Sequence, residues 1–325
     1  MSEEKQKGKR PLVILTGPTA VGKTALSIGL AKALGGEIIS ADSMQVYHGM
    51  DIGSAKITKE EMDGVPHHLI DVLEPWEDFN VTRFQSMAKE AAEDIYRRGH
   101  IPVVTGGTGF YIQALAYDID FKENDEGGQV RRELELLARE KGNEFLHSLL
   151  RELDPESAAA IHANNIKRVI RAIEYYKLTG EPISRHNRQE REKQTPYQLY
   201  YYVLTCDRAV LYARIDERVD QMLEAGLVDE VRRLKEQGCS RGMVSMQGLG
   251  YKEIMDYLDG VCTLDEAVRV IKRDTRHFAK RQLTWFKRER DVRWLELEAY
   301  DSDRKKVLEH MLEELSGISA EADEE

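Results

Sequence analysis

The stretch Gly17-Pro18-Thr19-Ala20-Val21-Gly22-Lys23-Thr24 decides the fold, because it fits the pattern G-x-x-x-x-G-K-[ST] at every fixed position. The apolar run at residues 12–15 precedes it, and a stretch of helical character begins near Ala25. Between a strand and a helix, the backbone N–H groups of such a loop and the helix N-terminus hold an anion together. The sequence therefore predicts that this chain binds a polyphosphate, with an ordinary glycine-rich turn as the alternative.

Two side chains of this loop have expected roles of their own. Lys23 reaches the terminal phosphates, and the Thr24 hydroxyl is expected to ligate Mg²⁺. The residues expected to contact the anion are Gly17, Thr19, Ala20, Val21, Gly22, Lys23 and Thr24.

The first third of the chain alternates strand and helix patterns. Apolar runs at residues 12–16, 37–40 and 101–104 are typical of buried strands. Residues 82–98 carry apolar side chains at helical spacing. This alternation predicts an α/β fold of the P-loop NTPase-like kind, in which helices flank a parallel sheet and ligands bind at its carboxyl edge. The loops that follow the three strands should converge there, and they are residues 17–24, 41–45 and 105–109.

The patterns change near residue 121. Residues 121–128 are rich in acids and glycine, which suits a hinge, and the segment after them is helical without strand signals. Helices are expected at residues 130–151 and 165–178, and Asn165 is expected to cap the second. A polar, proline-marked segment to residue 196 ends this part. A β-rich run at residues 200–206 then returns to the sheet, and the long helices expected after it are residues 211–237 and 266–288.

These boundaries define three expected parts. The P-loop core comprises residues 1–121 and 200–316. An all-α insertion domain comprises residues 122–199. The acidic tail at residues 317–325 is expected to be disordered, since six carboxylates and no Lys or Arg follow from Glu313 onward.

Composition narrows the class of protein. The chain has 325 residues, 41% of them apolar, which is enough for a substantial core. No apolar run approaches the roughly 20 residues of a membrane span, and the charged N-terminus lacks a signal segment, so we expect a cytoplasmic protein without a membrane partner. Cys206, Cys239 and Cys262 show no C-x-x-C spacing, which argues against a zinc site or a disulfide framework.

Charge is distributed unevenly along the chain. The net charge of −11 argues against a nucleic-acid partner at first sight. Residues 269–293, however, contain ten basic side chains and three acidic ones. They predict a basic patch, with a solvated helix face as the plainer interpretation.

One carboxylate stands out near the phosphate loop. P-loop NTPases normally place an acid after an apolar strand to organise Mg²⁺, yet residues 103–109 contain none. Asp42, two residues after the strand that ends at Ser40, is the acid expected to face the loop. Residue chemistry alone leaves two roles open for it, a water-mediated metal contact or a general base.

Several blocks of sequence in a fixed order closely resemble the tRNA dimethylallyltransferase family. The blocks are ILTGPTAVGKT (14–24), ISADSMQVY (39–47), MDIGSAK (50–56), PHHLID (66–71), GGTGFY (106–111), KRVIRA (167–172), QGLGYK (247–252) and AKRQLTW (279–285). The resemblance runs from about residue 12 to residue 294, and it is far more specific than the phosphate loop alone.

The resemblance implies a reaction. The family transfers a dimethylallyl group from dimethylallyl diphosphate to N6 of the adenosine immediately 3′ of the tRNA anticodon. A phosphate loop would then bind the leaving diphosphate, with Lys23 and with Mg²⁺ on Thr24 stabilising its charge. By resemblance Asp42 accepts the N6 proton, Thr108 contacts the target adenosine and Arg218 contacts the diphosphate. The plainer alternatives are a turn-forming Thr108 and a surface salt bridge from Arg218 to Glu217 or Asp220.

The implied partner is the tRNA anticodon stem-loop, and no protein partner is implied. The target base must leave its stack to react, so RNA contacts should surround the site. By resemblance the contacts are Asp42, Ser43, Met44, Gln45, Thr108, Arg131, Lys167, Arg168, Val169, Ile170, Arg171, Gln247, Gly248, Leu249, Gly250, Tyr251 and Lys252. On the helix expected after Asn165, Lys167 and Arg171 lie four residues apart beside Arg168 and opposite Ile166, which is consistent with a basic face.

Three other functions remain as alternatives. Relatives of the family prenylate free adenine nucleotides, although the helical insertion favours a macromolecular acceptor. A P-loop nucleotide kinase would need a second metal-organising acid, and a noncatalytic RNA-binding regulator would not need the loop, the base and the hydroxyl together.

His67-His68 has no metal-ligand spacing and is interpreted as structural or RNA-adjacent. Residues Lys280-Arg281 and Trp285-Phe286 combine basic and aromatic side chains, as RNA-binding segments do. The aromatic side chains would also suit a hydrophobic core.

Overall fold

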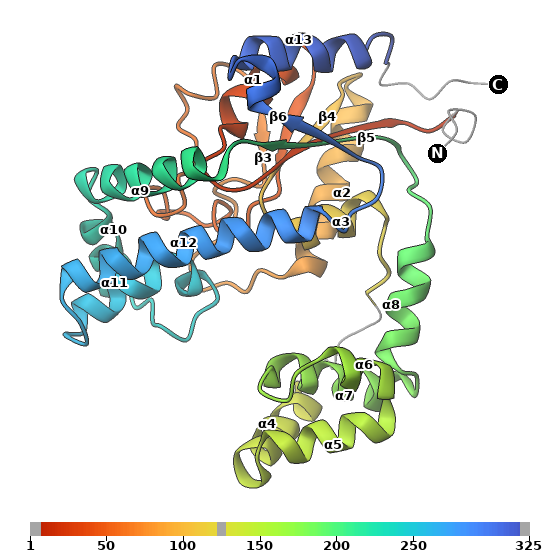
Figure 1. Cartoon of the computed structure of the whole chain (residues 1–325), viewed down its shortest axis with the longest axis vertical. Coiled ribbons are helices and arrows are strands. Elements are labelled where there is room, and N and C mark those ends of the chain that lie inside the picture. The colour runs from red at the N-terminus through yellow and green to blue at the C-terminus, as the bar shows by residue number, and fades with distance from the viewer. Residues whose placement is uncertain (1–7, 122–127, 319–325) are drawn as a thin grey trace. The chain divides into compact units, whose positions relative to one another are not determined.

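The computed structural model describes residues 8–121 and 128–318, and the chain divides into two compact units (Figure 1). The first, here the core unit, contains Met1–Ala116 and Thr195–Glu325, and the second, here the helical unit, contains Tyr117–Gln194. Most of the expected hinge, residues 122–127, and most of the expected acidic tail, residues 319–325, lie outside the described residues.

The core unit is built on one parallel sheet. Its strands, within the described residues, are β1 Pro11–Thr16, β2 Glu37–Ser40, β3 His67–His68, β4 Pro102–Gly106, β5 Gln198–Thr205 and β6 Val292–Glu296. Their order is β3-β2-β4-β1-β5-β6, and every pairing is parallel. In the centre of the sheet, Val13 of β1 pairs with Val103 of β4 and Tyr200 of β5. The predicted α/β class with a parallel sheet is confirmed, although sequence patterns did not indicate β3 or β6.

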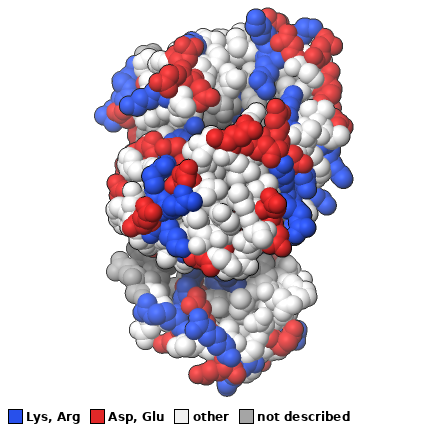
Figure 2. Space-filling view, turned by 90° about the vertical axis from the view of Figure 1, so that its left-hand side faces the viewer, with Lys and Arg blue, Asp and Glu red and all other residues white. Residues whose placement is uncertain are grey.

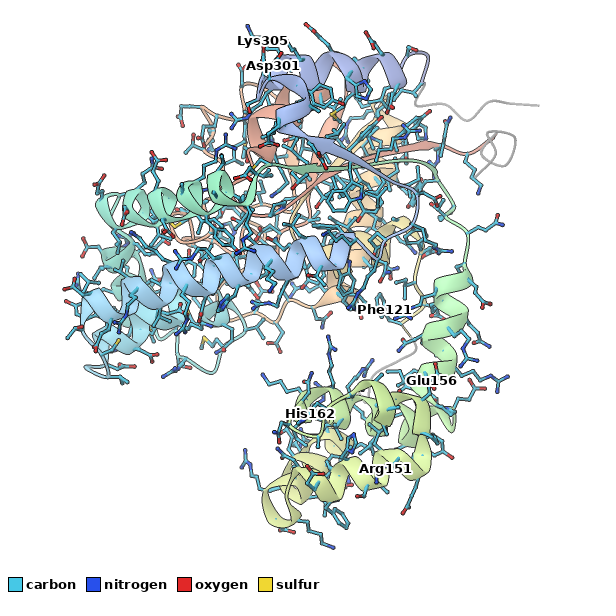
Figure 3. All side chains as sticks on the ribbon, in the orientation of Figure 1. Phe121, Arg151, Glu156, His162, Asp301 and Lys305 are labelled. Carbon is cyan, nitrogen blue, oxygen red and sulfur yellow. The ribbon has the colours of Figure 1, made fainter. Side chains whose placement is uncertain are left out.

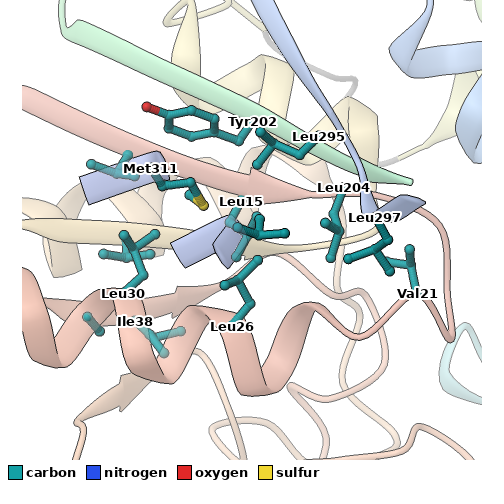
Figure 4. Packing of buried hydrophobic residues seen from close by; sticks show 14 of the residues in the cluster. Leu15, Val21, Leu26, Leu30, Ile38, Tyr202, Leu204, Leu295, Leu297 and Met311 are labelled. Atoms are coloured by element: carbon teal, nitrogen blue, oxygen red, sulfur yellow. The ribbon is translucent and has the colours of Figure 1, made fainter. Parts of the chain in front are cut away.

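Helices cover both faces of this sheet (Figure 1). Two of them, α1 Lys23–Leu34 and α13 Arg304–Glu314, lie on one face, and α2 Val81–Arg97 and α3 Gly109–Ala116 lie on the other. Because both faces are covered, all six residues of β1 are buried, which explains its continuous apolar run. Figure 4 shows the packing on the first face, where Leu15, Leu26, Leu30, Tyr202 and Met311 are all at most 2% exposed.

Two helices predicted as continuous are each broken at a glycine. The expected helix at 130–151 is α4 Gln129–Lys141 followed by α5 Asn143–Leu153, and Gly142 between them has φ 83°. The expected helix at 211–237 is α9 Arg208–Glu224 followed by α10 Leu227–Glu236, and Gly226 between them has φ 99°. A residue with positive φ cannot continue an α-helix, and glycine adopts that conformation without a steric cost.

The helical unit has a core of its own. Its remaining described helices are α6 Pro155–Ala160, α7 Ile166–Thr179 and α8 Ile183–Glu192. Leu146, Leu150, Val169 and Ile173 are completely buried among them. Asn165 is the N-cap of α7, as predicted, but its side chain makes no capping hydrogen bond. Sequence patterns did not indicate α8, which lies in the polar, proline-marked segment and begins after its N-cap, Pro182.

The other described helices of the core unit are α11 Tyr251–Leu258 and α12 Leu264–Phe286. The second confirms the helix predicted at 266–288, and it begins at a capping box between Thr263 and Glu266. Across the described part of the chain, no helix has the length and apolar character to cross a membrane.

Candidate active site

The phosphate loop has a backbone that only glycine permits at two positions. Gly17 has φ 146°, and a β-carbon on it would collide with the carbonyl oxygen of Leu204 on β5. Gly22 has φ 104° and forms the N-cap of α1, so the free N–H groups of that helix begin at the loop. Ala20 also has positive φ, at 64°, which costs an alanine some strain. The loop is therefore fixed in an anion-binding conformation by its backbone.

The loops after β1, β2 and β4 meet at the carboxyl edge of the sheet, which confirms the predicted convergence. The Ala41 N–H donates to the Thr105 carbonyl, at 2.7 Å, and the Thr108 N–H donates to the Ala41 carbonyl, at 3.2 Å. Asp42 and Thr108 are consequently held on neighbouring loops. Within the described residues, the Thr108 hydroxyl makes no hydrogen bond, so it is available to a ligand.

Gln282 of α12 joins two of these loops. Its Oε1 accepts the Thr19 N–H at 3.0 Å, and its Nε2 donates to the Gly107 carbonyl at 2.9 Å. The side chain is only 6% exposed. Gln282 belongs to the block AKRQLTW (279–285), but the sequence predicts no role for it. The only local indication is that it follows two basic residues of the same helix. Gln282 sets the spacing between the phosphate loop and the loop that carries Thr108.

Asp42 is oriented by its own backbone. Its Oδ1 accepts the N–H groups of Met44, at 2.8 Å, and Gln45, at 3.4 Å. Burial raises the pKa of the Asp42 carboxyl, and those two N–H groups and the charge of Lys23 act in the opposite direction. A half-buried carboxylate with a raised pKa and a free oxygen can accept a proton from a bound ligand.

Two cations face the phosphate loop from different elements. Lys23 Nζ donates to the carbonyls of Gly17, at 3.0 Å, and Pro18, at 2.9 Å. Burial, with a smaller contribution from the positive charge of Arg218, lowers the pKa of Lys23 to about 7, and Asp42 acts in the opposite direction. Burial also lowers the pKa of Arg218, and Glu61 opposes it. Because these two cations lie near each other, the site carries an excess of positive charge, which favours the binding of an anion.

The salt-bridge alternative for Arg218 is not what the structure shows. Asp220 pairs instead with Lys272, at 2.6 Å. In residues 8–121 and 128–318, no ion pair joins Arg218 to Glu217 or Asp220. The guanidinium is therefore left for a ligand, and its positive charge is close enough to Lys23 to help lower the pKa of that ammonium group.

The segment that follows Asp42 is held by hydrogen bonds to backbone groups. The Gln45 side-chain amide donates to the carbonyls of Ser54, at 3.3 Å, and Ala55, at 3.2 Å. Met44 lies against Gly248, where an added β-carbon would be 2.8 Å from the Met44 sulfur. The structure thus brings residues 42–45 and 247–252, two blocks expected to contact RNA, into direct contact.

A buried carboxylate fixes the loop that receives Gln45. Glu230 of α10 is 1% exposed. Its carboxylate accepts the N–H groups of Asp51, Ile52 and Gly53 at 2.8–3.0 Å and the Tyr251 hydroxyl at 2.7 Å. Sequence reasoning missed Glu230, since nothing in a helical Asp-Glu pair indicates which acid is buried.

The block at 247–252 divides into exposed and buried positions. Gln247 is exposed, and Leu249 and Lys252 are partly exposed, so their side chains can meet a ligand. Gly248 and Gly250 are buried. Tyr251, also expected at the RNA, is completely buried, and its hydroxyl donates to Glu230, so its side chain supports the segment from within.

The basic helix of the helical unit divides in the same way. Lys167 and Arg168 are exposed at the start of α7, whereas Val169 and Ile170 are 0% and 5% exposed in the core of the unit. The side chains of Val169 and Ile170 therefore pack in the core, and a contact of these two residues with RNA would be made by their backbone. Figure 2 shows a run of Lys and Arg side chains across the face of the helical unit that it presents.

Arg131 and Arg171 converge on one buried acid. Arg131 Nη2 lies 2.7 Å from Glu174 Oε2, and Arg171 Nη1 lies 3.0 Å from the same oxygen. Burial would raise the pKa of Glu174, but hydrogen bonds from Arg131 and Arg171 hold it below its ordinary value. Both arginines therefore carry part of the stability of this unit.

Other charged and polar residues of interest have structural partners. His68 Nε2 lies 2.7 Å from Glu37 Oε2, which supports the structural interpretation of that histidine. In the basic run at 269–293, Lys272, Arg276 and Arg293 form ion pairs with Asp220, Asp216 and Glu314. The run is thus partly neutralised, in agreement with its plainer interpretation.

The fold and the site together define a class, an α/β enzyme with a phosphate loop beside a carboxylate and two cations. A family model described as IPP transferase matches residues 45–289, and one described as isopentenyl transferase matches residues 11–72. The chain belongs to the IPP transferase family and is a prenyltransferase.

Relatives match over most of their length. A protein of Lachnoclostridium phytofermentans described as tRNA dimethylallyltransferase is 64% identical, with 90% of this chain and 94% of the relative covered. One of Carboxydothermus hydrogenoformans with the same description is 52% identical, with 88% and 91% covered.

Solved structures agree with the fold. The tRNA isopentenylpyrophosphate transferase of Bacillus halodurans has a TM-score of 0.72 and 48% identity, covering 95% of this chain and 96% of that one. A eukaryotic dimethylallyltransferase acting on tRNA has a TM-score of 0.77 and 29% identity, covering 93% and 78%.

Proposed function

We propose that this chain transfers the dimethylallyl group of dimethylallyl diphosphate to N6 of the adenosine immediately 3′ of a tRNA anticodon and releases diphosphate. The observation that carries the proposal is the arrangement at the carboxyl edge, where the phosphate loop lies beside the loops of Asp42 and Thr108. The description of a 64% identical relative as a tRNA dimethylallyltransferase supports it.

The donor half of the site binds diphosphate. Backbone N–H groups at the end of the loop and at the N-terminus of α1 hold the anion, and Lys23 and Arg218 supply positive charge. As the allylic C–O bond breaks, negative charge grows on the diphosphate, and groups already fixed around it stabilise that charge without reorganising. A phosphate loop thereby serves a reaction that consumes no ATP.

Mg²⁺ fits the donor half. The Thr24 side chain is exposed at the end of the loop, and its hydroxyl makes no hydrogen bond to the described residues. Mg²⁺ commonly takes a single protein oxygen together with substrate phosphates and water. Thr24 would hold the ion, which supplies further positive charge to the leaving group when bound.

The acceptor half handles the adenine amine. The N6 lone pair is delocalised into the ring, so N6 attacks the allylic carbon well only if its proton leaves to a nearby base. Asp42 is that base in our proposal, since its Oδ1 is fixed by Met44 and Gln45 and its Oδ2 makes no hydrogen bond to the described residues. The Thr108 hydroxyl on the neighbouring loop orients N6.

RNA contacts come from exposed or partly exposed groups. In the core unit these are Ser43, Met44, Gln247, Leu249 and Lys252, and the helical unit contributes Lys167 and Arg168. Arg131 contributes with the guanidinium nitrogen that Glu174 leaves unused, and Arg171, which also pairs with Glu174, adds positive charge beside it. An enzyme whose substrate is tRNA works where tRNA is found, so we place this one in the cytoplasm.

A comparison of acceptors tests the proposal. The protein is incubated with labelled dimethylallyl diphosphate and Mg²⁺ and, separately, with tRNA, AMP or ATP. Label should pass to tRNA alone. Transfer to AMP or ATP with none to tRNA would establish a free-nucleotide prenyltransferase. Consumption of ATP without prenyl transfer would establish a nucleotide kinase or ATPase.

A further inference from the structure

A third cation lies against the phosphate loop from the far end of the chain. Arg304 is the first residue of α13. A β-carbon built on Gly22 would lie 2.5 Å from its Nη2 and 2.8 Å from both its Cζ and its Nε. These similar distances place the face of the guanidinium against Gly22. The charge therefore stands at the N-cap of α1, within the loop that holds the anion.

The helix that carries Arg304 is anchored. Val307 and Met311, one and two turns further along α13, are completely buried in the core with Leu26 and Leu30 of α1. Figure 4 shows Met311 in this packing. Leu308 contacts α1 as well, since its Cδ2 would lie 3.0 Å from a β-carbon on Gly29. The backbone of Arg304 is thus fixed relative to the loop.

The local acids do not neutralise this arginine. Asp303 accepts the Lys305 N–H at 2.8 Å, and Asp301 accepts from Lys306 Nζ at 2.5 Å. Within the described ranges 8–121 and 128–318, Arg304 makes no hydrogen bond and no ion pair. The helix dipole disfavours a cation at a helix N-terminus, so an anion bound at the loop would stabilise this arrangement.

We propose that Arg304 is a third cationic contact to the diphosphate, in addition to Lys23 and Arg218. This inference deepens the proposed function and rests on it. A guanidinium presents paired N–H donors that match two phosphate oxygens. Lys23 folds back over Gly17 and Pro18, whereas Arg304 approaches over Gly22, so the two cations take different sides of the loop. Arg304 lies beyond residue 289, where the family match ends.

Neighbouring residues supply matched variants. Arg304→Gln keeps most of the side-chain length and removes the charge, and Arg304→Lys restores a point charge. Lys305→Gln is the control, because Lys305 is also exposed and basic but projects outward from α13 (Figure 3). Binding of inorganic diphosphate is measured by calorimetry, and KM for dimethylallyl diphosphate and for tRNA by steady-state kinetics.

Arg304→Gln should weaken diphosphate binding and raise KM for dimethylallyl diphosphate by about 10- to 100-fold, the range for charge-assisted hydrogen bonds. Arg304→Lys should recover part of the loss. Lys305→Gln should change both by less than about twofold, as surface substitutions do. KM for tRNA and the thermal midpoint should hardly change in any variant.

Two results would overturn the inference. One is diphosphate binding by Arg304→Gln equal to that of the parent, and the other is an equal loss in Lys305→Gln, which would indicate only a general surface field. Failure of the proposed function looks different, because the parent protein itself would then not transfer a prenyl group to tRNA.

Discussion

The phosphate loop and the basic face of α7 bind their proposed ligands by opposite means. In the loop, the contacts are backbone N–H groups whose positions follow from Gly17 and Gly22 and from hydrogen bonds to Gln282. On α7, they are the exposed tips of Lys167 and Arg168, while Arg171 is already bound to Glu174. Because the phosphate loop is preformed, the removal of a single group from it should impair the chemistry. On α7, each removed side chain should weaken RNA binding by a small amount.

The largest effect is expected at Asp42. Asp42→Asn removes the proton acceptor but keeps an oxygen for the N–H groups of Met44 and Gln45. Turnover should fall by roughly 10²- to 10⁴-fold, the range for a positioned general base. Single-turnover kinetics measure the loss, and tRNA binding, measured in parallel, should be retained. Turnover within about threefold of the parent would remove Asp42 from the base role.

The substitution Arg218→Ala tests the diphosphate-binding half of the site. The loss of a charge that acts on the developing diphosphate should lower kcat by on the order of 10²-fold. Arg276→Ala is a suitable control, because Arg276 pairs with Asp216 on the surface and touches no proposed ligand group. Equal effects in the two variants would mean that Arg218 acts only through the stability of α9.

Glu230→Gln tests how firmly the core unit holds its binding segments. The amide can no longer accept all four hydrogen bonds of the carboxylate, so buried donors lose partners. The free energy of unfolding should fall by about 1–3 kcal/mol in a urea titration. The adjacent Asp229→Asn, which breaks an exposed pair with Arg232, should cost less than about 1 kcal/mol. Equal losses of unfolding free energy in the two variants would show that Glu230 does not hold residues 51–53 in place.

The pKa of Lys23 predicts a pH dependence. In the free protein this pKa is lowered to about 7, from the ordinary 10.5, mainly by burial. The diphosphate favours the charged ammonium, so above pH 7 each bound molecule must also bring a proton to Lys23. Affinity for dimethylallyl diphosphate should therefore weaken by up to about tenfold per pH unit as the pH rises above 7. Lys23→Arg stays charged and should show a flatter profile, and parallel profiles would contradict the assignment.

The smallest change is expected on α7. Lys167→Ala with Arg168→Ala should weaken tRNA binding, and each lost phosphate contact should reduce the slope of log affinity against log salt by about 0.7 to 0.9. Affinity for dimethylallyl diphosphate should stay unchanged. Lys177→Ala, an exposed lysine in the last turn of the same helix, is the control. A salt slope identical to that of the parent would make this face ordinary solvated surface.

The two regions also differ in how far the sequence predicts them. The loop motif, the parallel sheet and the meeting of the loops after β1, β2 and β4 follow from local patterns, because backbone geometry there is dictated by residue type. The partners of charged side chains cannot be predicted from local sequence patterns. Nothing local indicates that Glu174 collects Arg131 and Arg171, that Glu230 holds residues 51–53, or that Arg304 reaches Gly22 from a distant helix. These contacts depend on tertiary packing.

If the phosphate loop serves prenyl transfer to RNA, the product can be found by mass analysis of nuclease digests. The protein is first incubated with tRNA, dimethylallyl diphosphate, ATP and Mg²⁺ together. We predict one dimethylallyl group on N6 of the adenosine 3′ of the anticodon, one diphosphate released for each group transferred, and an unchanged amount of ATP. Unmodified tRNA with steady, tRNA-stimulated hydrolysis of ATP would contradict this role of the loop.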